Sequence, residues 1–273
     1  ELLYKIYLSH YLAENGFKCY LGNKSYINRL IDTFEQYIYL DKGYHKGQSE
    51  ILFKKIKENK GIIINLDEEG GVDFSDGSTL LGRYAKPLFD LTDLVLFWGK
   101  SQYNLISKNF KINSKTAIVG HPRFELLSDK YRYLYQSEID EIKDKFQNFI
   151  LINTNMSFGN NIRGDQFVRK NYKSRFKDIE KIIISDKKKL EAYCSLVNLL
   201  SKKVDENIII RPHPEEKISF YHKRLTKLKN VKIIYKGSVI PWLMSSKFMI
   251  HPDCTTAIEY LFSNNTPISF LPQ

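Results

Sequence analysis

The sequence predicts an α/β protein with two domains in tandem, each built on a parallel sheet. Short apolar runs that suit buried strands alternate along the chain with longer segments that suit helices. This alternation is interrupted once, over residues 126–147, where the sequence is charged and rich in tyrosine, and it then begins again. With 273 residues, of which 42% are hydrophobic, the chain is long enough to form two such cores.

The first domain is predicted to cover residues 1–130. Its first helix ends at Asn15-Gly16, a common C-terminal cap, and the apolar run 61–66 is typical of a strand buried on both faces. The expected strands are 17–22, 36–40, 61–66, 93–99 and 116–120, and the expected helices are 2–14, 25–36, 47–59 and one that ends near 109.

The second domain is predicted to cover residues 131–273. It opens with a strand and then a long polar segment, 155–185, of the kind that is often functional. The expected strands are 148–154, 207–214, 231–235, 247–251 and 267–271, and the expected helices are 186–204, 215–228, 241–245 and 254–263. Because both ends fall beside expected elements, we expect the first domain to lack its first strand and the second to be cut near its end.

Composition narrows the class of protein. Cys19, Cys194 and Cys254 are too scattered for a disulfide framework or a zinc cluster, and no apolar run approaches the roughly 18 residues of a membrane span. The net charge of +11 comes from 33 lysines and only 9 arginines, whereas nucleic-acid readers favour arginine forks. We therefore expect a cytoplasmic protein whose charge attracts anionic substrates or an anionic membrane surface, and not nucleic acid.

Ligands of open α/β sheets bind beyond the carboxyl ends of the strands. There the first domain carries Asp67-Glu68-Glu69, followed by two glycines. Paired carboxylates raise the pKa of one member, which suits a general acid or base; a solvated turn is the alternative. In an extended backbone Asp67 and Glu69 share a face and Glu68 points the other way. We favour Glu68 or Glu69 as the catalytic group, because Asp67 is placed to cap the turn.

Two strand ends of the second domain carry polar groups suited to a phosphate. Arg211 and His213 stand in an Arg-Pro-His-Pro sequence that ends at Pro214, and the prolines restrict the backbone around the histidine. Asn153 and Asn155 stand at the end of the first strand of this domain and are predicted to contact the nucleotide. Ordinary turns are the alternative at both places.

The last such feature is Thr255-Thr256 at the start of a predicted helix, with Glu259 about one turn further on. Free N–H groups and two hydroxyls there suit a phosphate, and the carboxylate suits a ribose diol. A plain capping box of Thr256 and Glu259 is the alternative. Cys254 is expected to be a small buried thiol.

Together these motifs resemble bacterial surface-carbohydrate biosynthesis proteins, and the resemblance extends from about residue 10 to residue 271. The strings that carry it are LDEEGG, GHPRFELL, ILINTN, RPHP, PWL and HPDCTTAIE, in this order. Such proteins look like GT-B glycosyltransferases, with two Rossmann-like domains facing across a cleft. More remotely, the motifs resemble those of transferases that use CMP-activated sialic acid, pseudaminic acid or Kdo.

The resemblance implies a role for each matching residue. His213 would contact the CMP phosphate and assist its departure, Thr255 and Thr256 would hold that phosphate, and Glu259 would lie near the ribose. The acidic motif would supply the general base, or a group that acts on the sugar. This sequence departs from the pattern in having three acids before two glycines, and a Pro-Asp pair after His251.

The predicted function is therefore the metal-independent transfer of an acidic sugar from a CMP donor to a bacterial surface glycan, either free or lipid-linked. The alternatives are a CDP-glycerol-type polymer transferase, a nucleotide-sugar 2-epimerase-like enzyme and, in another class, a non-catalytic nucleotide- or glycan-binding module. No cofactor is expected besides the donor, and the expected location is the cytoplasm, including the inner face of the cell membrane.

Overall fold

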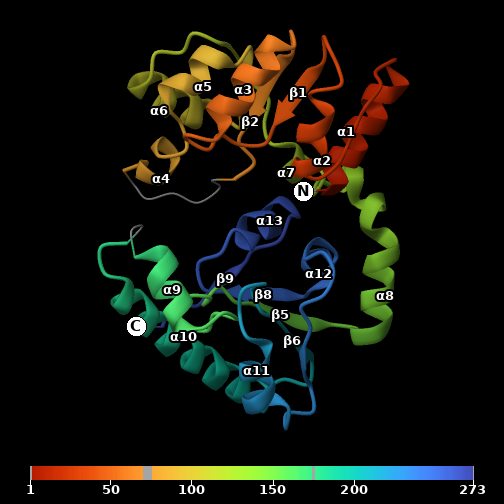
Figure 1. Ribbon diagram of the computed structural model, residues 1–273. Coiled ribbons are helices and arrows are strands. Elements are labelled where there is room, and N and C mark those ends of the chain that lie inside the picture. Colours follow the sequence, from red (N-terminus) through yellow and green to blue (C-terminus); the bar gives the residue numbers. More distant parts are fainter. Residues whose placement is uncertain (1, 70–75, 174–175, 273) are drawn as a thin grey trace. The chain divides into compact units, whose positions relative to one another are not determined.

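The computed structural model describes residues 2–69, 76–173 and 176–272, and it divides into two compact units, Glu1–Leu126 and Leu127–Gln273 (Figure 1). The sequence placed the domain boundary after residue 130, and the structure divides the chain after Leu126. Each unit contains one sheet in which every neighbouring pair of strands is parallel. The predicted class, two tandem α/β units, is confirmed.

Unit 1 has a four-stranded sheet in the order β1-β2-β3-β4. Its core forms because α3 turns Phe53 and Ile56 to the same side, where they pack with Ile63, Val95 and neighbouring residues. The elements are α1 Leu2–Glu14, α2 Lys24–Leu30, β1 Ile38–Asp41, α3 Ser49–Glu58, β2 Ile62–Leu66, α4 Ser78–Leu81, α5 Lys86–Leu91, β3 Leu94–Phe97, α6 Lys100–Asn109, β4 Lys115–Ile118 and α7 Pro122–Glu125.

Unit 2 has a five-stranded sheet in the order β7-β6-β5-β8-β9. The chain builds outward from β5 to β6 and β7, and then returns to add β8 and β9 on the other side, so strand order reverses beside β5. The elements are η1 Asp129–Tyr135, α8 Gln136–Phe146, β5 Phe149–Asn153, α9 Asp165–Tyr172, α10 Ile179–Leu200, β6 Asn207–Arg211, α11 Ile218–Leu225, β7 Val231–Ile233, α12 Ile240–Ser245, β8 Phe248–His251, α13 Thr256–Phe262 and β9 Ile268–Ser269.

The central strand β5 is buried along its whole length because helices cover both faces of the sheet. Ile150 and Ile152 pack into the cluster formed with α10 and α11. Phe149 points the other way and meets Trp242 of α12, with ring centroids 5.9 Å apart. Figure 1 shows α10 and α11 on one side of this sheet and α12 and α13 on the other.

Several expected elements differ in the structure. The predicted strand 17–22 is a loop that leaves Phe17 and Tyr20 51% and 42% exposed, although Tyr20 packs against Phe34. The predicted helix 25–36 ends at Leu30. Helix α10 begins at Ile179, not at residue 186, because Asp178 caps it by accepting a hydrogen bond from the Lys181 amide. The short helices α4 and α5 were not predicted.

Candidate functional site

The reversal of strand order in unit 2 brings the end of β5 beside the loop between β8 and α13. Asn153 donates from Nδ2 to the Thr256 hydroxyl at 3.0 Å, and Asn155 donates to the Asp253 carbonyl at 3.3 Å. Such a reversal, beyond the carboxyl ends of the strands, is where open α/β sheets bind ligands. The structure thus brings together two of the predicted motifs.

The start of α13 differs from a plain capping box. Thr255 is at the N-cap position but makes no side-chain cap hydrogen bond, and it is exposed. Thr256 is engaged with Asn153, and its hydroxyl lies 2.8 Å from the Cys254 thiol. Desolvation raises the pKa of that thiol, although the Cys254 residue is half-buried and not fully buried as the sequence predicted. Glu259 is buried one turn into the helix.

A glutamate that the sequence analysis did not select, Glu216, holds the loop after β6. Its side chain is only 1% exposed. One carboxylate oxygen accepts hydrogen bonds from the Thr154 hydroxyl at 2.8 Å, the Met156 amide at 3.0 Å and the His213 amide at 3.4 Å. The other oxygen accepts a hydrogen bond from the Tyr221 hydroxyl. Glu216 therefore ties the loop after β5 to the loop that carries the predicted phosphate-binding histidine.

His213 is half-buried, and the backbone fixes its orientation. Its Nδ1 accepts a hydrogen bond from the Glu215 amide at 3.2 Å. In the neutral ring the proton is therefore on Nε2, which makes Nε2 a hydrogen-bond donor. Pro212 before it is buried and Pro214 after it is exposed. This arrangement suits an oxyanion as the partner of Nε2.

Arg211 is placed differently from the sequence expectation. It is 7% exposed, donates to the carbonyls of Lys236 and Gly237 at 3.1 and 2.9 Å, and stacks over Trp242 at 5.2 Å. Among the residues described, no carboxylate forms an ion pair with it, and burial lowers its pKa to about 10. Its donors thus hold the segment after β7, and its contact with a nucleotide stays a prediction.

His251, another residue that the sequence analysis left without a role, ends β8 beside Asn153. The two residues follow the paired residues Ile152 and Ile250, so they point to the same face. His251 is 8% exposed and Asn153 is 4% exposed, and burial lowers the pKa of His251. In the described part of the chain neither Asn153 Oδ1 nor His251 Nδ1 has a hydrogen-bond partner. Buried polar atoms of this kind are uncommon and often occur at functional sites.

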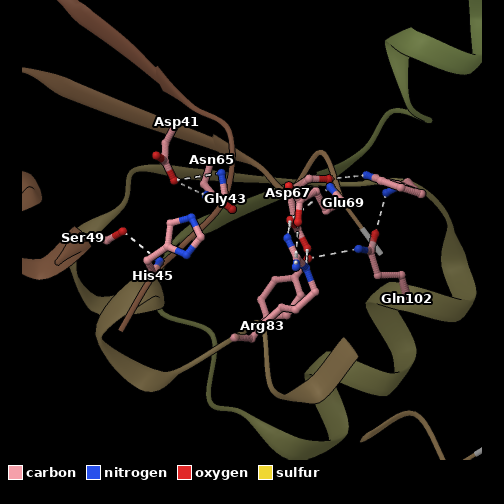
Figure 2. A network of polar contacts seen from close by, with 11 residues as sticks. Asp41, Gly43, His45, Ser49, Asn65, Asp67, Glu69, Arg83 and Gln102 are labelled. Atoms are coloured by element: carbon pink, nitrogen blue, oxygen red, sulfur yellow. Dashed lines mark hydrogen bonds and ion pairs between the residues drawn. The ribbon is translucent and has the colours of Figure 1, made fainter. Parts of the chain in front are cut away.

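In unit 1 the acidic motif lies at the end of β2, and Arg83 contacts two of its three carboxylates (Figure 2). Arg83 donates to both carboxylate oxygens of Asp67, from Nε at 2.6 Å, and reaches Glu69 at 3.4 Å. This pairing raises the pKa of Arg83. Asp67 is buried, whereas the Glu69 side chain is 68% exposed.

Glu68 points away from Arg83, as an extended backbone requires. It is 3% exposed and accepts hydrogen bonds from the Tyr4 hydroxyl and from Lys5 at 3.0 Å, both on α1. Each acid of the motif thus has a cation beside it, which offsets the mutual repulsion on which the sequence argument depended. The two glycines that complete the motif, residues 70 and 71, lie outside the described residues.

Asp41 at the end of β1 is a further acid that the sequence analysis did not select (Figure 2). Its Oδ2 accepts hydrogen bonds from Asn65 Nδ2 at 2.6 Å and from the Gly43 amide at 3.3 Å. Burial raises its pKa to about 6. The only signal in the sequence is an aspartate that ends an apolar run, which many surface turns share.

No group of three or more His, Cys, Asp or Glu side chains among the described residues is arranged to hold a metal ion. None of the helices in that part of the chain is long and apolar enough to cross a membrane.

No protein-family model matches the sequence, and no curated protein matches it significantly. Solved structures do match the fold. The UDP-GlcNAc 2-epimerase of Methanocaldococcus jannaschii has a TM-score of 0.54 at 11% identity, over 90% of this chain and 66% of that one. The structure of the same enzyme with UDP-GlcNAc and UDP has a TM-score of 0.51 at 11% identity, over 88% of this chain and 61% of that one. The S. aureus MnaA-UDP structure has a TM-score of 0.50 at 14% identity, over 88% of this chain and 58% of that one.

These likenesses confirm the fold class predicted from the sequence, the GT-B architecture of two Rossmann-like units. The chain spans 58–66% of the length of the proteins in these three structures. Sequence identities of 11–14% show that the fold is shared, but they do not show a shared activity or substrate.

Proposed function

We propose that this chain belongs to a nucleotide-sugar enzyme of bacterial surface-glycan synthesis and that unit 2 binds the nucleotide. The observation that carries the proposal is the meeting of Asn153 with Thr256 where the strand order of unit 2 reverses. His213 stands on the next loop along this edge, with a donor nitrogen oriented by the backbone. Fixed donors at the carboxyl edge of a parallel sheet suit the phosphate of a nucleotide.

The reaction that we favour is an epimerisation of a UDP-sugar. Two of the structures that share the fold are named for a UDP-GlcNAc 2-epimerase, one of them in complex with UDP-GlcNAc and UDP, and the third is named as a complex with UDP. None of these names mentions CMP. The transfer of an acidic sugar from CMP, which the sequence motifs imply by resemblance, is the second candidate.

In either reaction we assign proton transfer to an acid of unit 1. Asp67 is the weakest candidate, because Arg83 occupies both of its oxygens. Glu68, Glu69 and Asp41 are the alternatives. Asp41, with a pKa of about 6, is poised to give and take a proton near neutral pH, as epimerisation at a carbon requires.

Binding of UDP, CDP and CMP, measured by isothermal titration calorimetry, tests the nucleotide site. We expect saturable binding that His213→Ala and Thr255→Ala weaken at least about tenfold, equivalent to about 1.4 kcal/mol. Lys188→Ala and Thr266→Ala are controls, since both side chains are exposed in the same unit and lie outside the predicted nucleotide site. The proposal fails if no nucleotide binds, or if the controls weaken binding as much.

The preference among nucleotides then separates the two reactions. Epimerisation predicts UDP as the tightest ligand and the gain of one deuterium when UDP-GlcNAc is incubated with the protein in D₂O, read by mass spectrometry. Tighter binding of CMP with no deuterium uptake would favour transfer of an acidic sugar. Asp41→Asn, Glu68→Gln and Glu69→Gln, assayed in parallel, identify the acid: its loss lowers turnover far more than UDP affinity.

A further inference from the structure

Unit 2 has a hollow of about 470 Å³ along β7, the terminal strand of its sheet. We call it the β7 hollow. It is bounded by the end of α8, by α11 with its connection to β7, and by β7 itself. The hollow follows the whole of β7, from Lys229 before the strand to Ile234 after it. None of the residues that line it belongs to the predicted nucleotide site, so the two are separate.

The lining of the β7 hollow is apolar within and basic at the rim. Buried apolar side chains form its floor: Phe146, Leu225 and Val231. Exposed basic or titratable side chains surround it: Lys145, His222, Lys229 and Lys232. No Asp or Glu is among the described residues that line it. An occupant must therefore be negatively charged at one end and apolar at the other.

The sequence around the hollow is basic over a long stretch. Between Glu216 and Asp253 it contains no acidic residue and eight basic ones: Lys217, Lys223, Arg224, Lys227, Lys229, Lys232, Lys236 and Lys247. Among the described residues, ion pairs engage only Arg224, with Glu191, and Lys247, with Glu206. Lys229 and Lys232 at the rim therefore form no ion pair with any described carboxylate.

Protection of an edge strand does not account for this charge. Lysine on an edge strand discourages pairing with another sheet, and Lys232 on β7 is placed to do this. Lys145 and Lys229 lie on other elements, at the end of α8 and before β7, yet they border the same hollow. Their convergence on an apolar floor needs another reason.

We propose that the β7 hollow binds the phosphate head group of an anionic membrane lipid. The lysines offer compact charges to the phosphate, and the apolar floor accepts the carbon atoms next to it. An acidic polysaccharide or a nucleic acid would use the lysines but leave the floor without a function. The negative surface of a phospholipid leaflet also attracts basic clusters of this kind. The inference does not depend on the reaction proposed above.

Binding to vesicles tests this inference. The protein is mixed with phosphatidylcholine vesicles, with or without phosphatidylglycerol, and the bound fraction is measured by co-flotation. We expect binding only to the anionic vesicles, and binding about thirtyfold weaker for Lys229→Glu/Lys232→Glu, equivalent to about 2 kcal/mol. The matched control is Lys170→Glu/Lys188→Glu, which makes the same change of net charge at exposed positions of the same unit and should weaken binding less than about threefold.

Several results would overturn the inference. Absence of binding to anionic vesicles would do so directly. An equal loss of vesicle binding in both double variants would show that net charge alone attracts the protein to the membrane. Displacement of the vesicles by free glycerol phosphate would indicate a site for a soluble phosphate, and tighter binding of dextran sulfate would indicate a polyanion site. All substituted lysines are exposed, so the circular dichroism of the variants should match that of the parent chain and exclude misfolding.

Discussion

Replacing Glu216 by alanine tests whether this residue organises the loops at the predicted nucleotide site. The carboxylate accepts hydrogen bonds from two hydroxyls and two backbone amides while it is 1% exposed. The hydroxyls of Thr154 and Tyr221 can rotate toward other acceptors. The amides of Met156 and His213 are fixed by the backbone and would be left unpaired.

The expected cost follows from those unpaired groups. An unsatisfied buried donor costs about 1–3 kcal/mol, so the two unpaired amides together cost about 2–6 kcal/mol. We therefore expect Glu216→Ala to lower the free energy of unfolding of unit 2 by about 2–6 kcal/mol. Nucleotide binding by the molecules that remain folded should also weaken, because the loop that carries His213 loses the hydrogen bonds that hold it in place.

Tryptophan fluorescence can report on unit 2 alone. The chain has two tryptophans, Trp98 in unit 1 and Trp242 in unit 2, so a Trp98→Phe background isolates the signal from unit 2. This matters because two units need not unfold in one step. Urea unfolding of Glu216→Ala is compared with Glu215→Ala, whose side chain is only half-buried and should cost less than about 1 kcal/mol. Equal shifts in the two variants, or a shift below about 1 kcal/mol for Glu216→Ala, would refute the reasoning.

Three further predictions concern stability, each measured by urea unfolding. Arg83→Gln should destabilise unit 1 by about 3–5 kcal/mol, because Asp67 is left as a buried charge without its cation. Gly159→Ala should destabilise unit 2 by about 1–3 kcal/mol, because its new methyl group would lie 2.6 Å from the Lys187 backbone nitrogen. Burial raises the pKa of Asp186 to about 6, so the unfolded state releases this proton at lower pH than the folded state. The free energy of unfolding of the parent chain, measured relative to that of Asp186→Asn, should thus fall by up to about 3 kcal/mol as the pH rises from about 4 to about 6. Above that pH the difference should stay constant.

Matched variants control these three measurements. Lys86→Gln removes an exposed ion pair with Asp90 and should cost less than about 0.5 kcal/mol. Gly99→Ala adds a methyl group with no atom within 4 Å and should cost less than about 1 kcal/mol, through the poorer N-cap of α6. For Asp186, the measured quantity is the difference between parent and variant at each pH, so the titration of other carboxylates largely cancels. A difference that stays constant with pH would contradict the raised pKa.

The sequence predicted most of the fold because continuous apolar runs mark buried parallel strands directly. The run 61–66 became β2 (Ile62–Leu66), and the run 148–154 became β5 (Phe149–Asn153). The segment 17–22 (FKCYLG) is interrupted by a lysine; it was also predicted as a strand, but it lies on no sheet. A strand needs a neighbouring strand as well as a suitable sequence, and that neighbour is not visible in a local pattern.

The positions of the site residues followed from topology, but their partners did not. The rule that ligands bind beyond the strand ends located Asn153 and Thr256 separately, and the sheet order then placed them 3.0 Å apart. Arg211 was predicted to face a ligand because it ends a buried strand. In the structure its side chain turns to two carbonyls and an aromatic face about 25 to 31 residues further along the chain.

Glu215 and Glu216 show why the rest of the site could not be predicted. They are identical side chains at adjacent positions after the same proline, and no local propensity distinguishes them. Glu216 is buried because donors from Thr154, Met156 and Tyr221 converge on it, and two of these lie about sixty residues earlier in the chain. A buried carboxylate is stable only where several donors meet, and that meeting is set by the packing of β5 against β6. The residue that positions the predicted phosphate-binding histidine is therefore determined by tertiary structure, even though the histidine itself is recognisable in the sequence.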